Sequence, residues 1–259
     1  MGTPTRFTSG VSIDNTSNVM GSMPLPDPNT VIRYYNDFNT YAAGDWTVNA
    51  GGAGSSAAVG AGAGGLLLVT TATSGAESVV GNPAFFFQAT TGSAKGNQFW
   101  FTTNVTLDAT VSQPDYQIGV VKGTMSSFQN ETDGVYFMKK TGAVVTGTDT
   151  AWNLVIKAAA GATTTIRLPT STLPLNSAVI QLGFYYDAKP SPTMFVYWNG
   201  SVVGTIGAGG SLGTGTSADL TNLPGSTILM GVTYYNGYHT GTSLLSADYV
   251  LAACETSRI

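Results

Sequence analysis

The feature that most constrains the fold is an Asn-Gly pair between two alternating runs, in the stretch TMFVYWNGSVVGTI at 193–206. Both residues of an Asn-Gly turn adopt positive φ readily, so Asn199-Gly200 predicts a two-residue β-hairpin. Similar runs, rich in β-branched and aromatic residues and bounded by Asp-Gly, Pro or Gly clusters, recur along the chain. The sequence therefore predicts an all-β chain of many short-linked strands, a sandwich or jelly roll.

The clearest single strand is NQFWFTTNVTLD at 97–108, in which alternate residues from Phe99 to Leu107 share one face and Trp100 lies on the other. The least certain segment is AWNLVIKAAAG at 151–161, where a short helix is also compatible with the pattern. Residues 207–226, GAGGSLGTGTSADLTNLPGS, read as a mobile loop or a long crossover. The other predicted strands are DYQIGVVKG, DGVYFMKK, TTTIRLP, AVIQLGFYYDA, TILMGVTYYNG and SLLSADYVLAA.

Residues 1–30 differ from the β-rich domain predicted over 31–259, because their apolar residues are isolated and PLPDP ends the segment. Such a segment cannot bury enough surface by itself to offset the entropy of ordering. It is therefore either a disordered tail or an extended arm that orders on a partner. The arm hypothesis takes as its anchors Arg6, Phe7, Val11, Val19, Met20 and Leu25.

Charge excludes several classes of partner. Only 9% of the residues are charged, where roughly 25% is usual, and the net charge is −4. Nucleic-acid binding requires clustered Lys and Arg, whereas the ten basic residues here are scattered, so no nucleic-acid partner is expected. Residues 46–76 are uncharged, but repeated Gly, Ser and Thr interrupt the apolar run that a membrane-spanning helix requires. No membrane partner is therefore expected.

Catalytic and metal-binding patterns are weak. The single cysteine, Cys254, allows no intrachain disulfide and reads as a buried thiol. Glycosidases need two carboxylates on opposite sides of the sugar bond, but the nearest candidates, Glu131 and Asp133, stand immediately before a turn. The one histidine, His239, follows an Asn-Gly turn without a nucleophile motif. We therefore predict no enzyme activity, no catalytic residues and no cofactor.

The sequence also contains candidate residues for a calcium site and for a sugar-binding site. Asp133, Asp187 and Asp219 are loop acids but lack the close spacing of a calcium loop, so no metal ligands are assigned. Sugar recognition needs aromatic faces and amides, which are supplied in one stretch by Tyr234, Tyr235, Asn236, Tyr238 and His239. Because alternate residues of a strand point to opposite faces, at most half of that set could line one site.

Several motifs resemble the concanavalin A-like sandwich of laminin-G domains and legume lectins. YYNDFNTYAAGDWTVN resembles the opening strand, GAGGLLLVTTA the next, and DGVYFMKK a central strand. LGFYYDAKPSPTMFVYWNGSVVGTI is similar to the late hairpin, and LLSADYVLAA to the closing strand. The resemblance implies a jelly-roll β-sandwich over about 31–253.

A narrower resemblance is to head proteins of tailed bacteriophages. TPTRFTSGVS looks like the N-terminal arm of virion proteins, and an uncharged Thr- and Gly-rich jelly roll behind such an arm is similar to capsid decoration (cement) proteins. The resemblance implies a structural protein on the capsid surface of the virion. Its partners would be the major capsid protein and further copies of the chain, as a homotrimer or homodimer. The alternative is a non-catalytic carbohydrate-binding module of a phage fibre or cell-surface protein.

Overall fold

The computed structural model describes the chain in sixteen ranges, and statements below concern these residues. All six predicted arm anchors lie outside the described residues, as do Tyr238 and His239. The described ranges are 23–24, 31–38, 46–51, 56–60, 66–71, 77–81, 85–86, 97–108, 115–122, 131–140, 149–158, 162–169, 176–188, 191–224, 229–237 and 243–255.

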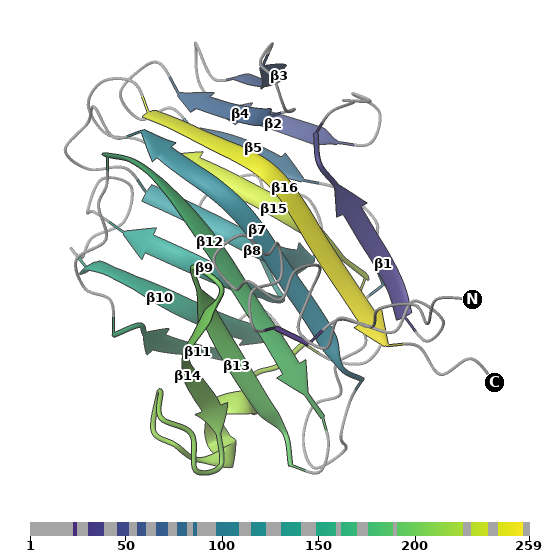
Figure 1. Ribbon diagram of the computed structural model, residues 1–259, viewed down its shortest axis with the longest axis vertical. Helices are drawn as coiled ribbons and strands as arrows, with labels where there is room; N and C mark the ends of the chain where they lie inside the picture. The colour runs from purple at the N-terminus through teal and green to yellow at the C-terminus, as the bar shows by residue number, and fades with distance from the viewer. Residues whose placement is uncertain are drawn as a thin grey trace, which may run out of the picture.

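The strands form two antiparallel sheets that face each other (Figure 1). Sheet A runs in the order β14 (Ser201–Gly207), β13 (Thr193–Trp198), β12 (Asn176–Asp187), β7 (Phe99–Asp108), β16 (Ser243–Glu255), β4 (Leu66–Thr71) and β3 (Ser56–Gly60), and β1 (Val31–Asn36) also pairs with β16. Sheet B runs in the order β11 (Ala162–Arg167), β10 (Asp149–Ala158), β9 (Gly134–Lys140), β8 (Asp115–Lys122), β15 (Leu229–Gly237), β5 (Glu77–Gly81) and β2 (Thr47–Gly51), and β6 (Phe85–Phe86) also pairs with β15.

This architecture confirms the predicted all-β sandwich. The segment for which a helix was considered is strand β10, paired with β9 and β11 on its two edges. Its β-branched residues Val155 and Ile156 are both buried, which a helix at the molecular surface would not achieve. Within the described ranges, no helix has the length and hydropathy needed to cross a membrane.

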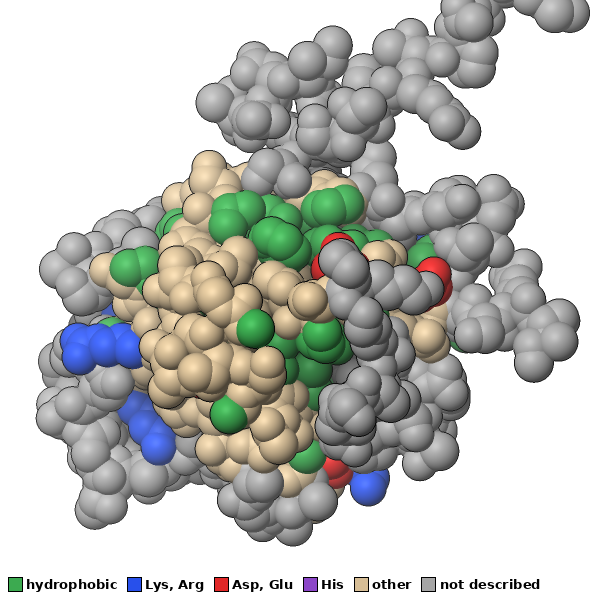
Figure 2. Space-filling view, turned by 90° about the horizontal axis from the view of Figure 1, so that it is seen from below, with side chains coloured by type: hydrophobic (Ala, Val, Ile, Leu, Met, Phe, Trp, Pro, Cys, Tyr) green, Lys and Arg blue, Asp and Glu red, His purple; other side chains and the backbone are tan. Residues whose placement is uncertain are grey.

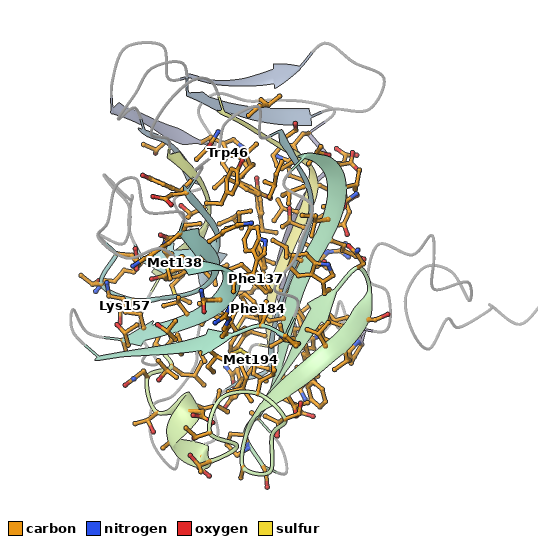
Figure 3. The ribbon with its side chains drawn as sticks, turned by 90° about the vertical axis from the view of Figure 1, so that its left-hand side faces the viewer. Trp46, Phe137, Met138, Lys157, Phe184 and Met194 are labelled. Atoms are coloured by element: carbon orange, nitrogen blue, oxygen red, sulfur yellow. The ribbon has the colours of Figure 1, made fainter. Side chains whose placement is uncertain are left out.

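Aromatic side chains from both sheets fill the space between them (Figure 3). Phe137 of sheet B lies 5.9 Å from Phe184 of sheet A between ring centroids, and Trp152 lies 5.9 Å from Trp198. Phe38 and Trp46, two aromatic residues of the predicted opening motif, are also in this core with centroids 5.6 Å apart. Burying one such side chain contributes roughly 2 kcal/mol, so this layer is the main source of stability.

The Asn-Gly hairpin forms as predicted. Trp198 pairs with Ser201, so the loop between β13 and β14 has two residues, and both have positive φ: 46° at Asn199 and 75° at Gly200. Farther along, the register shifts between Val196 and Tyr197, which marks a bulge that increases the local twist. The positive φ angles of the turn residues and the twist of the two strands therefore favour the same hairpin geometry.

Residues 207–224, predicted as a mobile loop or a long crossover, belong to the connection that crosses from β14 of sheet A to β15 of sheet B. They form an internally hydrogen-bonded loop containing the short 3-10 helix η3 (Ser217–Leu220). The buried carboxylate of Asp219 accepts from the backbone N–H groups of Thr214 and Thr216 and from the Thr214 hydroxyl, at 3.0, 3.2 and 2.7 Å. Sequence composition missed this because Gly, Ser and Thr form ordered turns as well as flexible ones when one acceptor organises them.

Candidate functional site

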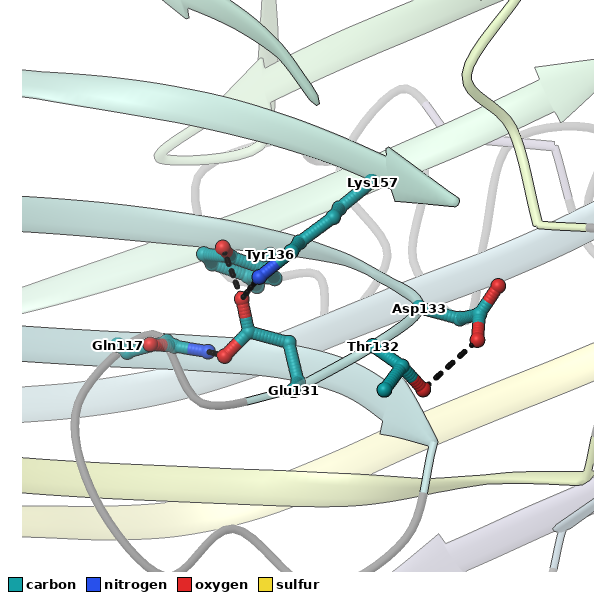
Figure 4. A network of polar contacts seen from close by, with 6 residues as sticks. All are labelled: Gln117, Glu131, Thr132, Asp133, Tyr136 and Lys157. Carbon is teal, nitrogen blue, oxygen red and sulfur yellow. Dashed lines mark hydrogen bonds and ion pairs between the residues drawn. The ribbon is translucent and has the colours of Figure 1, made fainter. Parts of the chain in front are cut away.

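The outer face of sheet B, which points away from the core, carries a buried polar network centred on Glu131 (Figure 4). Its Oε1 accepts a hydrogen bond from the Tyr136 hydroxyl and lies 3.4 Å from Lys157 Nζ. Its Oε2 accepts from Gln117 Nε2 at 3.1 Å. Strands β8, β9 and β10 thus each supply one partner to a carboxylate whose side chain is completely buried.

Apolar side chains surround this network. Val121, Tyr136, Met138, Val155 and Tyr235 form a second hydrophobic cluster on the same face, and Met138 and Lys157 project outward from sheet B in Figure 3. Burial raises the pKa of Tyr136, and the negative charge of Glu131 and the hydrogen bond to it raise it further. Tyr136 therefore remains a neutral donor, and Lys157 supplies the opposite charge that a buried carboxylate requires.

The network does not contain a catalytic pair of carboxylates among the described residues. Asp133 lies where β8 ends and β9 begins, and it accepts from the Thr132 hydroxyl at 2.9 Å and lies 3.7 Å from Lys122 Nζ. Both oxygens of Glu131 are already engaged by protein donors. The sequence did not reveal this network, because Gln117 and Lys157 lie 14 and 26 positions away from Glu131.

Lys139 is a buried lysine on the core side of sheet B. Lys139 is 2% exposed and pairs across β9 with Tyr116 of β8 and Trp152 of β10. The Tyr116 and Trp152 rings are nearly parallel, with centroids 6.4 Å apart. Burial lowers the pKa of Lys139 to about 8, because an apolar environment disfavours the charged amine.

The aromatic residues considered for sugar recognition occupy buried positions in β15. Tyr234 points into the core, where its hydroxyl lies 2.7 Å from Thr103 Oγ1, and Tyr235 points to the opposite face beside Met138. This alternation was expected, but both tyrosines and Asn236 are fully buried. A sugar ring could not stack on either tyrosine without opening the structure.

The three loop acids considered for calcium are not brought together. Asp133 lies beside Lys122, Asp187 accepts from Gln98 Nε2 at 3.0 Å, and Asp219 caps its own loop. The described residues contain no group of three or more metal-ligating side chains. Each acid therefore has a local structural role.

The outer face of sheet A carries an aromatic cluster that the sequence analysis did not recognise. Trp100 of β7 stacks on Tyr185 of β12 with centroids 5.1 Å apart, and Tyr185 stacks on Phe195 of β13 at 5.9 Å. Tyr197 and Met23 belong to the same cluster. The signal was present in the runs FWF, FYY and FVYW, in which both alternating positions are aromatic, as in strands that are covered on both faces.

Charged side chains are sparse around these surfaces. Figure 2 shows one end of the molecule, where the described surface is mostly apolar or uncharged and the few charged side chains lie toward the margins. Of the six basic residues within strands, Lys122, Lys139, Lys140, Lys157 and Arg167 belong to sheet B and only Arg33 belongs to sheet A. The strands of sheet A also contain Asp108, Asp187, Asp248 and Glu255, so sheet A is poor in positive charge, and its outer face carries the aromatic cluster.

No protein-family model and no curated protein sequence matches this chain. Among solved structures, it is similar to peanut lectin bound to a 9mer peptide, with 10% identity, 86% of this chain and 97% of that chain covered, and a TM-score of 0.55. It is also similar to a glycoside hydrolase family 16 endo-glucanase from Bacteroides ovatus, with 10% identity, coverage of 84% and 98%, and a TM-score of 0.55.

A third similar structure is the CBM2 module of Lactobacillus casei BL23 phage J-1 evolved Dit, with 12% identity, coverage of 89% and 99%, and a TM-score of 0.50. At such low identities the similarity establishes the fold alone, on which lectins and hydrolases both occur. The protein is a concanavalin A-like jelly-roll sandwich, as the sequence motifs predicted.

Proposed function

We propose that this chain is a non-catalytic structural protein of a bacteriophage particle, which binds the outer surface of the capsid and stabilises contacts between capsomers. The observation that carries the proposal is the aromatic cluster on the outer face of sheet A, where Met23 of the N-terminal segment is buried. A segment held on this face can extend from the sandwich and add apolar contacts to a neighbouring shell protein.

Two further features support this proposal. The low charge of the chain favours lateral association, because neighbouring copies repel one another weakly. Glu131 and Asp133 have internal partners, which fits a structural role for both carboxylates. Repetition over symmetry-related sites would strengthen a modest single contact through multivalency.

Quantitative mass spectrometry of gradient-purified particles from the source of the protein tests the proposal. Hundreds of copies per particle are expected for a protein that coats the capsid. A handful of copies would instead indicate a fibre or tail protein, and absence from the particles would exclude a virion role. Removing residues 1–22 should abolish binding to purified shells while leaving the circular dichroism of the sandwich unchanged.

The second candidate function is carbohydrate binding without catalysis. It is favoured by the lectin-like fold and by the similarity to a module of a phage protein. Since Tyr234 and Tyr235 are buried, the sugar-contacting residues would have to come from elsewhere, with Tyr238 and His239 as the remaining candidates. Glycan-array binding that is lost in both Tyr238→Ala and His239→Ala, with unchanged melting temperature, would support this function over the first.

A further inference from the structure

Met23 lies on the outer face of sheet A, eight positions before β1 begins at Val31. It is 1% exposed although the face it covers points away from the main core. Its cluster also contains Val31 and Ala253. Met23 can be buried in this aromatic cluster on sheet A only if the surface of the sheet has space for its side chain.

The receiving surface is a socket made of one glycine and three aromatic rings. A Cβ atom added at Gly183 of β12 would lie 2.7 Å from the terminal methyl carbon of Met23 and 3.0 Å from the Phe101 carbonyl oxygen. A side chain at position 183 would therefore displace the terminal methyl group of Met23 and press on the backbone of the neighbouring strand β7. The stacked pair Trp100 and Tyr185, together with Tyr197, complete the cluster around it.

Methionine suits this socket for a physical reason. Its unbranched side chain adapts to irregular spaces, and its polarizable sulfur makes favourable contacts with aromatic rings. Burial raises the pKa of Tyr197 to about 12, as expected where aromatic side chains exclude water. The thioether of Met23 is thus shielded from water by the side chains of this cluster.

We propose that the Gly183 socket is the anchoring site of the N-terminal segment, with Met23 of the same chain as its occupant. The anchor fixes the point from which residues 1–22 depart, and these residues can span at most roughly 70 Å when extended. The segment thereby emerges on the side of sheet A, so the capsid protein contacts that side of the sandwich. This orientation rests on the proposed function, whereas the anchor itself does not.

Peroxide oxidation of the full-length protein tests the anchor directly, with the sulfoxide at each methionine quantified by mass spectrometry. We expect Met23 to oxidise at least about tenfold more slowly in the folded protein than in urea, because its sulfur is buried. Gly183→Val should fill the socket and remove most of this protection. Ser201→Val, which places the same side chain at an exposed position of β14, should leave it intact.

The wild-type measurement keeps the inference falsifiable even if Gly183→Val does not fold. Equal oxidation of Met23 in the folded and urea-unfolded protein would overturn the anchor. Protection that disappears on dilution, in step with dissociation seen by light scattering, would show that Met23 of a second copy fills the socket and would overturn the intrachain occupant.

Binding to purified shells separates the anchor from the proposed function. Met23→Asp should weaken binding at least about tenfold, because it releases the segment from sheet A, and Thr165→Ala on the exposed surface of β11 in sheet B should have no effect. Protected Met23 combined with unchanged shell binding by Met23→Asp would retain the anchor and overturn the orientation. Absence of shell binding by the wild-type protein would refute the proposed function alone.

Discussion

The Glu131 carboxylate connects the three neighbouring strands β8, β9 and β10 through one residue of each strand. It accepts from Gln117 and Tyr136 and pairs with Lys157, all on the outer face of sheet B. Removing one partner of a buried ion pair leaves the other charge unpaired, which destabilises the folded state far more than replacing the whole pair by apolar residues. The network is therefore sensitive to removal of its central acceptor.

We expect Glu131→Ala to reduce the free energy of unfolding by about 3 kcal/mol, because it leaves the half-buried Lys157 without its carboxylate and two buried donors without an acceptor. Glu131→Gln should cost less, since it retains the size of the side chain and one carbonyl oxygen. Urea unfolding followed by circular dichroism measures both. Asp248→Asn, at an exposed acid, serves as the control, and equal stability of Glu131→Ala and this control would contradict the structural role.

Lys139 has the opposite character, because its charge is a cost to the folded state. Its pKa in the folded protein is about 8 and its ordinary value is 10.5, so the unfolded chain binds more protons between these values. The contribution of Lys139 to stability therefore rises with pH from about 8 to 10.5 and is least favourable below pH 8.

Lys139→Met should consequently stabilise the protein at pH 7 by about 1–3 kcal/mol, which corresponds to the lowered pKa of the amine. The advantage over wild type should shrink as the pH rises through this interval. Melting temperatures of the two proteins, compared at the same pH from 6 to 10.5, test the prediction. Lys140→Met, on the neighbouring and less buried lysine, is the matched control.

At the scale of the element, the β13–β14 hairpin depends on two residues with positive φ. Gly200 has a φ of 75° and is buried, and a β-branched side chain there would be strained by its own backbone. We expect Gly200→Val to cost about 1–3 kcal/mol and to lower the melting temperature by several degrees. Ser201→Val, one position later in an extended strand, should be nearly neutral, and similar losses in both variants would argue against the turn as the cause.

Strand positions were predictable where alternation and turn residues agreed, as in β7 from Phe99 to Asp108 and in the hairpin around Asn199-Gly200. The prediction failed where partners are distant in sequence. Asp219 is an exception, because its partners are only three and five positions away, and Gly, Ser and Thr content did not identify it as the organiser of its loop. The helix considered at 151–161, by contrast, could not be rejected without its neighbours β9 and β11. The socket under Met23 was hidden for the same reason, since Gly183 and Trp100 approach only through β12–β7 pairing.

At the scale of the whole molecule, basic residues are concentrated in sheet B and the aromatic cluster lies on sheet A. Binding through the aromatic cluster on the outer face of sheet A should then depend little on ionic strength, because salt screens charges and does not screen apolar contacts. We expect the affinity for purified shells to change less than about threefold between 50 and 500 mM NaCl. A loss of tenfold or more, measured by co-sedimentation, would indicate that the charged face of sheet B makes the contact.

Strand β16 has a further consequence, for the timing of synthesis. It pairs with β7 along one edge and with β4 and then β1 along the other, so it joins the early and middle parts of sheet A. Its final residue emerges from the ribosome about 150 residues after the end of β7, a delay of roughly 10–30 s at ordinary elongation rates. During that interval β7 presents an unpaired edge, and the apolar faces of sheet A lack their central strand. The sandwich must therefore complete its folding late, and a nascent chain stalled before residue 243 would be a substrate for chaperones and proteases.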